Sequence, residues 1–308
     1  MNISSFINNT SELIVMLEIT ILGTSGSVPT TERGMPALAI KYESDILLWD
    51  CGEGTQRQLM KYKVGYGSVS QLYITHPHLD HYLGVYGLLE TLKLSSVSPK
   101  PLSVFSPQIF TGEQEERYKF VKFSKMRKGV LYNTNTYQVS AFPVRHCRGS
   151  YGLVFEEAET RKFHEKKAHS LGLRGKLFKE IQKKGEVTVG GKRVKLDDVT
   201  WIRPGRRIVY SGDGRPSDNT LEAARNADVL IHEGTFDSSK KEEAEERLHC
   251  TVEEAAELAK KAKAKRLVIT HISPRYSDIE VLEKEARKIF PKTELAHDGM
   301  KITVPVRQ

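Results

Sequence analysis

Short apolar runs separated by glycines and polar turns predict a strand-rich first half of the chain. Residues 17–22 (LEITIL) combine β-branched side chains with polar positions, and a small-residue loop follows at 23–27. Two further runs, at 37–41 and 46–49, are joined by a polar turn. The run at 72–74 is typical of a buried strand, and the residues after it predict a helix from Tyr82 to about Leu94.

The second half alternates strand and helix patterns. Strands are predicted at 207–210, 229–231, 266–269 and 301–304, and helices at about 219–225, 252–262 and 279–290. Earlier in the chain, 137–144 and 151–156 predict a hairpin, and 112–123 predicts a polar helix. This pattern indicates an α/β fold in one domain spanning residues 1–308.

The regular pattern breaks between about residues 157 and 206. This segment is rich in lysine and punctuated by glycines, and residues 161–207 hold fifteen Lys or Arg against five Asp or Glu, a net charge of +10. The whole chain carries +8, so the rest of it is slightly acidic. We therefore expect a flexible basic arm inserted at 157–206, a charge distribution that favours an acidic partner such as nucleic acid.

Three histidines and one aspartate follow the predicted strand at 72–74 within six positions. They are His76, His78, Asp80 and His81. His76 and His78 are two apart, so in an extended stretch they project to the same side, whereas Asp80 and His81 follow where the chain turns. One zinc ion usually takes about four ligands and a catalytic one keeps a position open. The spacing therefore predicts two ions side by side, each still short of ligands.

Other predicted strands also end at residues that can bind metal. These strand ends carry Asp50, His146, Asp213, Glu233 and His271. Asp50 stands beside glycines and is interpreted as a turn former. We expect His76, His78 and His146 to bind the first ion. Asp80, His81 and His271 are expected to bind the second, with the carboxylate of Asp213 bridging both.

Two adjacent ions indicate hydrolytic chemistry, because they lower the pKa of a shared water and neutralise charge on the attacking and leaving oxygens. Asp80 is expected to accept the proton of that water. Glu233 with His249 could then supply the proton that the leaving oxygen needs. His249 precedes Thr251 and Glu254, a capping box that would fix the start of the next helix.

Several segments together resemble the metallo-β-lactamase superfamily and, within it, the ribonuclease Z family of tRNA 3′ processing endonucleases. The resemblance covers about residues 17–304. It is carried by 22–24, 29–33, 50–56, 75–84, His146, 211–213, 232–236, 249–251 and 270–276. The H-x-H-x-D-H segment marks only the superfamily, whereas the segments HEGTF and HCT and the arm before Asp213 are similar to ribonuclease Z.

The resemblance implies a four-layer αββα sandwich with two Zn²⁺ per subunit and a homodimer whose arm holds precursor tRNA. It implies removal of the 3′ trailer by attack of a metal-bound hydroxide, with the 3′-hydroxyl left on the tRNA. A hydrolase of small phosphodiesters or thioesters would share the metals but has no use for a basic arm. A purely RNA-binding protein is disfavoured by the full ligand set, and hydrolysis of β-lactams by Asp213, where those enzymes commonly have Cys.

Residues 1–15 are interpreted as a loose extension rather than a signal peptide, and no stretch has the length of a membrane span. The three cysteines form no C-x-x-C pair, and their odd number indicates a reduced, cytoplasmic protein.

Overall fold

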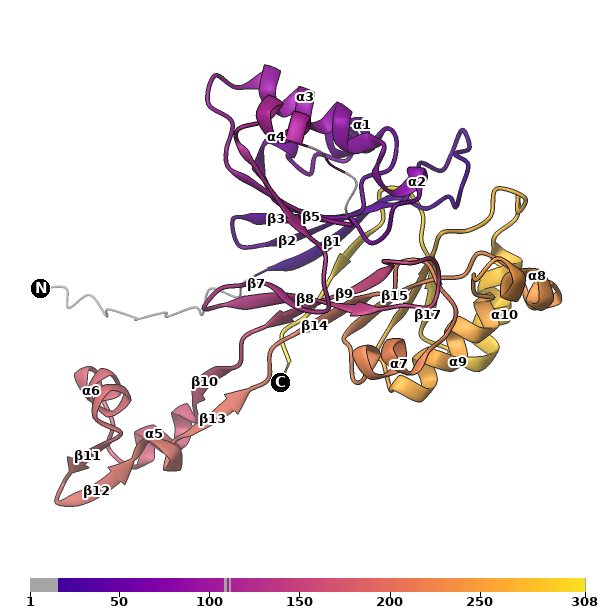
Figure 1. The fold of residues 1–308 in the computed structure, drawn as a ribbon. Helices are drawn as coiled ribbons and strands as arrows, with labels where there is room; N and C mark the ends of the chain where they lie inside the picture. Colours follow the sequence, from indigo (N-terminus) through magenta and orange to yellow (C-terminus); the bar gives the residue numbers. More distant parts are fainter. Residues whose placement is uncertain (1–15, 108–109, 111, 308) are drawn as a thin grey trace, which may run out of the picture.

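The computed structural model describes residues 16–107, 110 and 112–307, so the expected loose extension at 1–15 lies outside the described residues. Two sheets of seven strands each stack face to face, with helices on the outer face of each (Figure 1). This is the predicted αββα sandwich. Among the described residues, every helix is too short or too polar to cross a membrane.

The first sheet has the strand order β18-β1-β2-β3-β4-β5-β6. Its strands are β1 (Leu17–Gly23), β2 (Ala37–Tyr42), β3 (Asp45–Trp49), β4 (Val69–Tyr73), β5 (Leu102–Ser106), β6 (Val121–Lys125) and β18 (Lys301–Thr303). Strands β3 to β6 run parallel, and β1 and β2 are antiparallel to their neighbours. Both faces of β3 are covered, which is why its sequence is continuously apolar after Asp45.

The second sheet has the order β17-β16-β15-β14-β9-β8-β7. Its strands are β7 (Gly129–Asn133), β8 (Tyr137–Pro143), β9 (Tyr151–Glu157), β14 (Arg207–Tyr210), β15 (Val229–Glu233), β16 (Leu267–Thr270) and β17 (Thr293–Leu295). Strands β14 to β17 are parallel, as the alternation of strands and helices predicts, whereas β7, β8 and β9 form an antiparallel meander.

Three apolar layers hold the sandwich together. The central layer lies between the sheets and contains Trp49, Tyr73, Phe155 and Ile231. The first sheet is covered by α1 (Thr55–Lys61), α3 (Gly84–Ser95) and α4 (Gly112–Arg117). The second is covered by α7 (Asp218–Ala224), α9 (Val252–Ala262) and α10 (Glu280–Ile289), beside which lies α8 (Lys241–Glu246). Short 3₁₀ turns occupy Tyr66–Ser68, Leu196–Asp198 and Ser238–Lys240.

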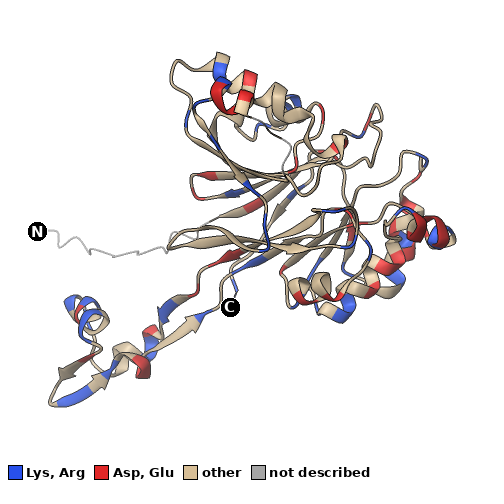
Figure 2. Cartoon of the chain, in the orientation of Figure 1, with Lys and Arg blue, Asp and Glu red and all other residues tan. Residues whose placement is uncertain are grey.

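The chain leaves the second sheet after β9 and returns to it at β14 through a projecting, folded segment (Figure 1). Its stem is the antiparallel pair β10 (Thr160–Phe163) and β13 (Thr200–Arg203). Beyond the stem lie α5 (Glu165–Ser170), α6 (Lys176–Lys184), β11 (Glu186–Val189) and β12 (Lys192–Lys195). They enclose a small apolar cluster of their own. Figure 2 shows that basic residues are frequent along this segment, called the arm below.

One predicted helix was wrong in extent, and several observed elements were not predicted. The helix expected over 112–123 ends at Arg117, and Val121–Lys125 is a strand because it pairs with β5. Where the pattern of the chain breaks, the arm still forms regular elements, and Gly172 and Gly185 adopt the left-handed backbone of the turns between them. The short strands β7 and β17 and helix α8 were also not predicted.

Candidate metal centre

The predicted strand-end residues meet at one edge of the sandwich. Strands β3 and β4 are parallel, as are β14, β15 and β16, so their carboxyl ends point the same way. The end of β8 joins them because it pairs with the start of β9, which is antiparallel to β14. This edge gathers Asp50, His76, His146, Asp213, Glu233 and His271, as parallel strands in layered folds commonly do.

The H-x-H-x-D-H segment begins extended and ends in the single-turn helix α2 (Leu79–Tyr82). Asp80 and His81 therefore lie on a helical turn rather than on an irregular one. This turn packs directly on the backbone after β3: the amide of Cys51 donates to the carbonyl of His81, and the amide of Gly84 donates to the carbonyl of Cys51. A Cβ on Gly84 would lie 1.9 Å from the carbonyl oxygen of Gly52, so only glycine allows this approach.

Three histidines form the first group of candidate ligands. The Nδ1 atom of His78 lies 3.0 Å from Nε2 of His76 and 3.1 Å from Nε2 of His146. Asp213 completes the group, with its Oδ2 atom 3.7 Å from Nε2 of His76. His76 is fully buried, whereas His78 is exposed to solvent, so the group is closed on one side and open on the other.

Asp80, His81 and His271 form the second group, and Asp213 lies between the two groups. The Oδ2 atom of Asp213 is 3.2 Å from Nε2 of His81 and 3.1 Å from Nε2 of His271. Asp80 approaches the same two nitrogens at 3.7 and 3.6 Å. All seven predicted ligand residues thus converge, and Asp213 has the central position expected of it.

Three of the ligand histidines are held through the Nδ1 atom of the ring. Nδ1 of His81 donates to Asp50 at 2.8 Å, and Nδ1 of His146 donates to the carbonyl of Leu248 at 3.0 Å. Nδ1 of His271 lies 2.9 Å from the hydroxyl of Thr235. These contacts leave the Nε2 atoms of His81, His146 and His271 facing the centre, whereas His78 presents Nδ1. Outer partners of this kind fix the tautomer and orientation of metal-binding imidazoles.

Burial and charge act against each other on the ionisable groups. Burial favours the neutral form of His81, but Asp213 and Asp50 outweigh it and raise its pKa well above the usual value. Burial also raises the pKa of Asp213, but His271 and His81 outweigh it and hold that pKa well below its usual range. At His76 no carboxylate outweighs burial, so burial and, after it, the neighbouring His81 lower its pKa. The cluster therefore holds negative charge that a cation would neutralise.

The donor set fits bound metal ions. Nε2 of His81, Nε2 of His271 and Oδ1 of Asp213 are buried and have no hydrogen-bond partner, although the Nε2 atoms lie near the Asp213 carboxylate. Such buried orphan atoms are costly unless something satisfies them. Imidazole nitrogens with carboxylate oxygens are the donors that zinc and similar divalent ions take in proteins.

Glu233 and His249 form a pair beside the ligands. Oε1 of Glu233 lies 2.9 Å from Nδ1 of His249, and the carboxylate also accepts from the amides of Gly214 and Cys250 and the hydroxyl of Thr235. Burial alone would lower the pKa of His249, but Glu233 outweighs it and raises that pKa to about 9. The capping box of Thr251 and Glu254 is confirmed, and it fixes the start of α9 directly after His249. His249 also lies close enough to Asp213 and His271 to be a ligand.

Sequence reasoning missed the residues that support these side chains. Asp50 is fully buried and accepts from His81, Thr75 and Tyr210, so it is much more than a turn former. Arg215 donates to the carbonyl of His249 and to the carboxylate of Glu254, and thereby links the segment after Asp213 to the start of α9. The place of Asp50 at a strand end was a usable signal, whereas nothing local marked Arg215.

Comparisons with known proteins agree on fold and family. The family model described as "Beta-lactamase superfamily domain" matches residues 182–272, and the model described as "Anti-Pycsar protein Apyc1" matches residues 17–112. The solved structure of YhfI from Bacillus subtilis, a metallo-β-lactamase fold protein, superposes with a TM-score of 0.70 at 18% identity, covering 94% of this chain and 99% of that one. The fold is therefore the metallo-β-lactamase fold.

Closer relatives narrow the class. Ribonuclease Z of Methanosarcina acetivorans is 40% identical over 305 residues, 95% of this chain and 99% of its own length, and that of Archaeoglobus fulgidus is 38% identical over 94% and 98%. The short form of human tRNase Z is 27% identical with a TM-score of 0.67, covering 94% of this chain and all of that one. The chain belongs to the ribonuclease Z family.

Proposed function

We propose that the chain is a zinc-dependent endoribonuclease that removes 3′ trailers from precursor tRNA. The observation that carries the proposal is the convergence of seven metal-binding side chains, with buried orphan atoms, at one edge of a chain similar to ribonuclease Z along nearly its full length. A hydrolase of small phosphodiesters remains the second candidate by chemistry, but no feature of the site favours it over the RNA substrate.

His76, His78 and His146 would hold one zinc ion and Asp80, His81 and His271 a second, with Asp213 shared. Bound there, the ions would lower the pKa of a water molecule and neutralise charge on the phosphate. The water oxygen attacks phosphorus, and Asp80 accepts its proton. The bond from phosphorus to the 3′ oxygen of the tRNA breaks, so the tRNA keeps a 3′-hydroxyl and the trailer keeps the phosphate.

The departing 3′ oxygen needs a proton, and His249 supplies it. Glu233 accepts the Nδ1 hydrogen of His249, which leaves Nε2 as the proton donor of a ring that lies beside Asp213 and His271. Because its pKa is raised to about 9, the ring is protonated near neutral pH. Glu233 is in turn fixed by two backbone amides and one hydroxyl, so the imidazole has a rigid partner.

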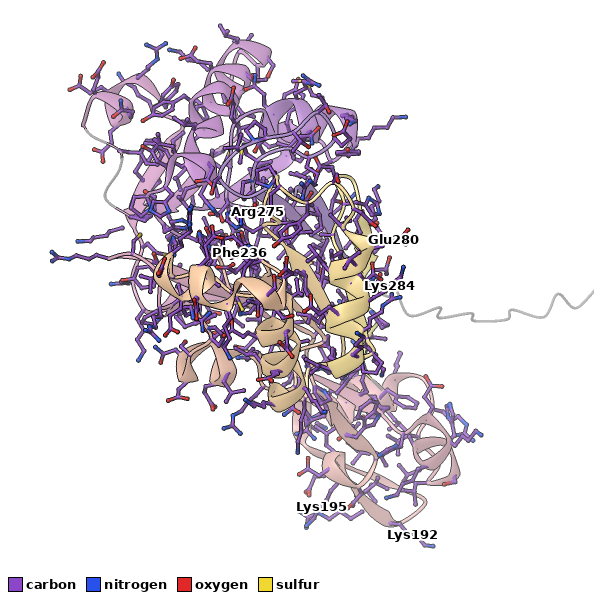
Figure 3. All side chains as sticks on the ribbon, turned by 90° about the vertical axis from the view of Figure 1, so that its right-hand side faces the viewer. Lys192, Lys195, Phe236, Arg275, Glu280 and Lys284 are labelled. Carbon is purple, nitrogen blue, oxygen red and sulfur yellow. The ribbon has the colours of Figure 1, made fainter. Side chains whose placement is uncertain are left out.

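The arm holds the tRNA body. Its exposed lysines include Lys179 and Lys183 on α6 and Lys192 and Lys195 on β12. Figure 3 shows Lys192 and Lys195 at the end of the arm farthest from the sandwich. Positive charge of this density binds phosphates by releasing counterions.

The arm leaves the opposite end of β9 and β14 from the metal centre, since Tyr151 and Tyr210 are at the site end and Glu157 and Arg207 at the arm end. An arm so placed suits a homodimer in which it serves the partner's site. Exposed Leu79, Leu83 and Tyr86, on and after α2, offer apolar surface for such contact. We propose a cytoplasmic location, consistent with three free cysteines.

A 3′-extended tRNA transcript tests the proposal directly. Cleavage should occur after the discriminator base, leave a 3′-hydroxyl, stop when a chelator is added and return with Zn²⁺.

A shortened protein tests the arm. Phe163 and Thr200 pair across the stem, so Asn-Gly can replace residues 164–199 as a two-residue turn. Precursor cleavage should collapse, whereas hydrolysis of bis(p-nitrophenyl) phosphate should survive. If a shortened protein that folds and keeps its metals processes precursor tRNA normally, the arm does not hold it.

A further inference from the structure

A groove at the side of the sandwich, distinct from the arm, lies where the edge strands of the two sheets face one another. It has a volume of about 720 Å³, and its walls include Phe105, Lys122, Lys125, Arg127, Tyr132 and Tyr151. Strand β6 is the edge of the first sheet and β7 the edge of the second, and residues 126–128 cross between them. The groove lined by Phe105, Lys122, Lys125, Arg127, Tyr132 and Tyr151 is called the edge groove below.

The charge of the edge groove is one-sided. Lys122, Lys125 and Arg127 are exposed, and within the described part of the chain none of them has a carboxylate partner. None of the residues lining the groove is acidic. On the arm, by contrast, Arg161 and Arg193 pair with Asp197 and Glu186. Free cations crowded along a groove repel one another and favour a polyanionic ligand.

Aromatic rings stand among these cations. Phe105 stacks on the buried ring of Tyr73, with centroids 4.9 Å apart and planes 8° from parallel. Tyr132 stacks on the buried ring of Tyr137 at 6.0 Å and 26°. Phe105 is only 9% exposed and forms the floor of the groove, whereas the half-buried ring of Tyr132 is accessible and is held rigidly from behind. Fixed aromatic rings beside a line of cations form the usual binding surface for unpaired nucleotides, whose bases stack while their phosphates meet Lys and Arg.

The groove lies beside the strand end that carries the metal centre. The amide of Tyr151 donates to the carbonyl of Thr75 at 3.0 Å, and Thr75 directly precedes the candidate ligand His76. The amide of Ile74 donates to the carbonyl of Phe105 at 2.8 Å, which ties the other wall of the groove to the same strand end. Both walls of the groove are thus attached to the residues just before His76, which places the groove next to the site where a phosphodiester bond would be cut.

We propose that the edge groove binds single-stranded RNA, namely the unpaired 3′ trailer downstream of the scissile bond, a role that rests on the proposed function. The tRNA body is base-paired almost to the cleavage position, so its bases are unavailable for stacking on Tyr132 and Tyr151. The trailer is the unpaired part of the substrate. Arm and groove then have different tasks: the arm holds the folded RNA, and the groove holds the strand to be removed.

Binding of a fluorescein-labelled oligouridylate to the full-length, metal-loaded protein tests this, by anisotropy over a range of salt concentrations. The variant Lys122→Gln/Lys125→Gln/Arg127→Gln should bind more weakly and lower the slope of log K against log salt by about two, since each phosphate contact on a single strand contributes ~0.7. Tyr132→Leu should also weaken binding, and Tyr132→Phe should restore it, because stacking needs the ring and not the hydroxyl.

A charge-matched control removes three exposed lysines from α9 and α10, in Lys260→Gln/Lys284→Gln/Lys288→Gln. It should keep the salt slope of the wild type. Both triple variants should hydrolyse bis(p-nitrophenyl) phosphate at the wild-type rate, which shows that fold and metals are intact. The proposal is overturned if the wild type does not bind the oligouridylate, if the groove variant keeps the wild-type slope, or if only binding of trailer-free tRNA is lost.

Cleavage separates this inference from the proposed function. Precursor tRNAs with long trailers should have a lower KM than those with a single extra nucleotide, and the groove variant should lose that difference. If the wild type cuts precursor tRNA but the difference survives in the variant, the groove is wrong and the proposed function stands. If oligouridylate binding depends on the groove but no precursor is cut, the groove binds RNA and the proposed function is wrong.

Discussion

Asp50 and His81 are joined by a hydrogen bond of 2.8 Å between two fully buried side chains, one directly after β3 and the other on α2. Asp50 also accepts from the backbone amide and the hydroxyl of Thr75. One carboxylate therefore fixes the imidazole of a candidate ligand and the residue before another. The geometry of the centre depends on this residue, although Asp50 itself belongs to neither ligand group.

Asp50→Asn should weaken metal binding by about 10–100-fold, the usual effect of losing an outer partner of a ligand histidine. Asparagine keeps the shape and tolerates the left-handed backbone at this position, where φ is 55°. Isothermal titration with Zn²⁺ measures the change, and exposed Asp278→Asn is the control. Unchanged affinity would show that Asp50 only shapes the turn.

Asp213→Ala should disturb both ions, because its Oδ2 atom lies 3.7 Å from Nε2 of His76 and 3.1 Å from Nε2 of His271. Elemental analysis should show metal content falling well below that of the wild type, together with loss of cleavage. Asp218→Ala, at the exposed start of α7, should keep both. Two tightly bound metals in the Asp213 variant would exclude the shared role.

His249→Ala should retain metal and lose about 10²–10⁴-fold in kcat, the usual contribution of a positioned general acid. Its imidazole contacts Glu233 rather than completing either of the two predicted ligand groups. Metal content and kcat are measured on the same preparation. Metal lost along with activity would instead make His249 a ligand, a role that its closeness to Asp213 and His271 allows.

The rate should fall as pH rises through the pKa of His249. That pKa is raised from 6.5 to about 9 because Glu233 outweighs burial, so the proton needed by the leaving oxygen is present at neutral pH and lost in alkali. Bound cations repel the imidazolium, which places the alkaline limb at or below pH 9. A pH profile of kcat measures it, and His249→Ala should lack this limb. A limb that persists in the variant belongs to another group.

Gly84→Ala should destabilise the fold by roughly 3 kcal/mol or more, because the new Cβ overlaps backbone that cannot move aside. It would lie 1.9 Å from the carbonyl oxygen of Gly52. Gly67→Ala is the matched control, since nothing lies within 4 Å of its Cβ position and its φ is ordinary. Urea denaturation of both variants gives the free energies of unfolding. Equal stability of the two variants would mean that the start of α3 can move away from the backbone after β3 at no cost.

The ligand residues could be predicted because each follows an apolar strand whose pattern is visible locally, and β4 and β16 read directly as buried runs before His76 and His271. The strand end places Asp50 at the site, but its bond to His81 could not be predicted, because the two residues are 31 positions apart. Residues 121–123 were misassigned for a similar reason. Only pairing with β5 decides that so short a segment is a strand.

The arm encloses its own apolar cluster, which includes Leu173, Ile181 and Val194, and connects to the sandwich through the stem of β10 and β13. Within the described residues, this cluster shares no member with the three apolar layers of the sandwich. Two parts that share no core can open independently, each with its own cooperativity. Under the proposed function, mutational drift inside the arm is free to alter which RNAs are captured without changing the residues of the metal centre, and the two properties can evolve separately within one chain.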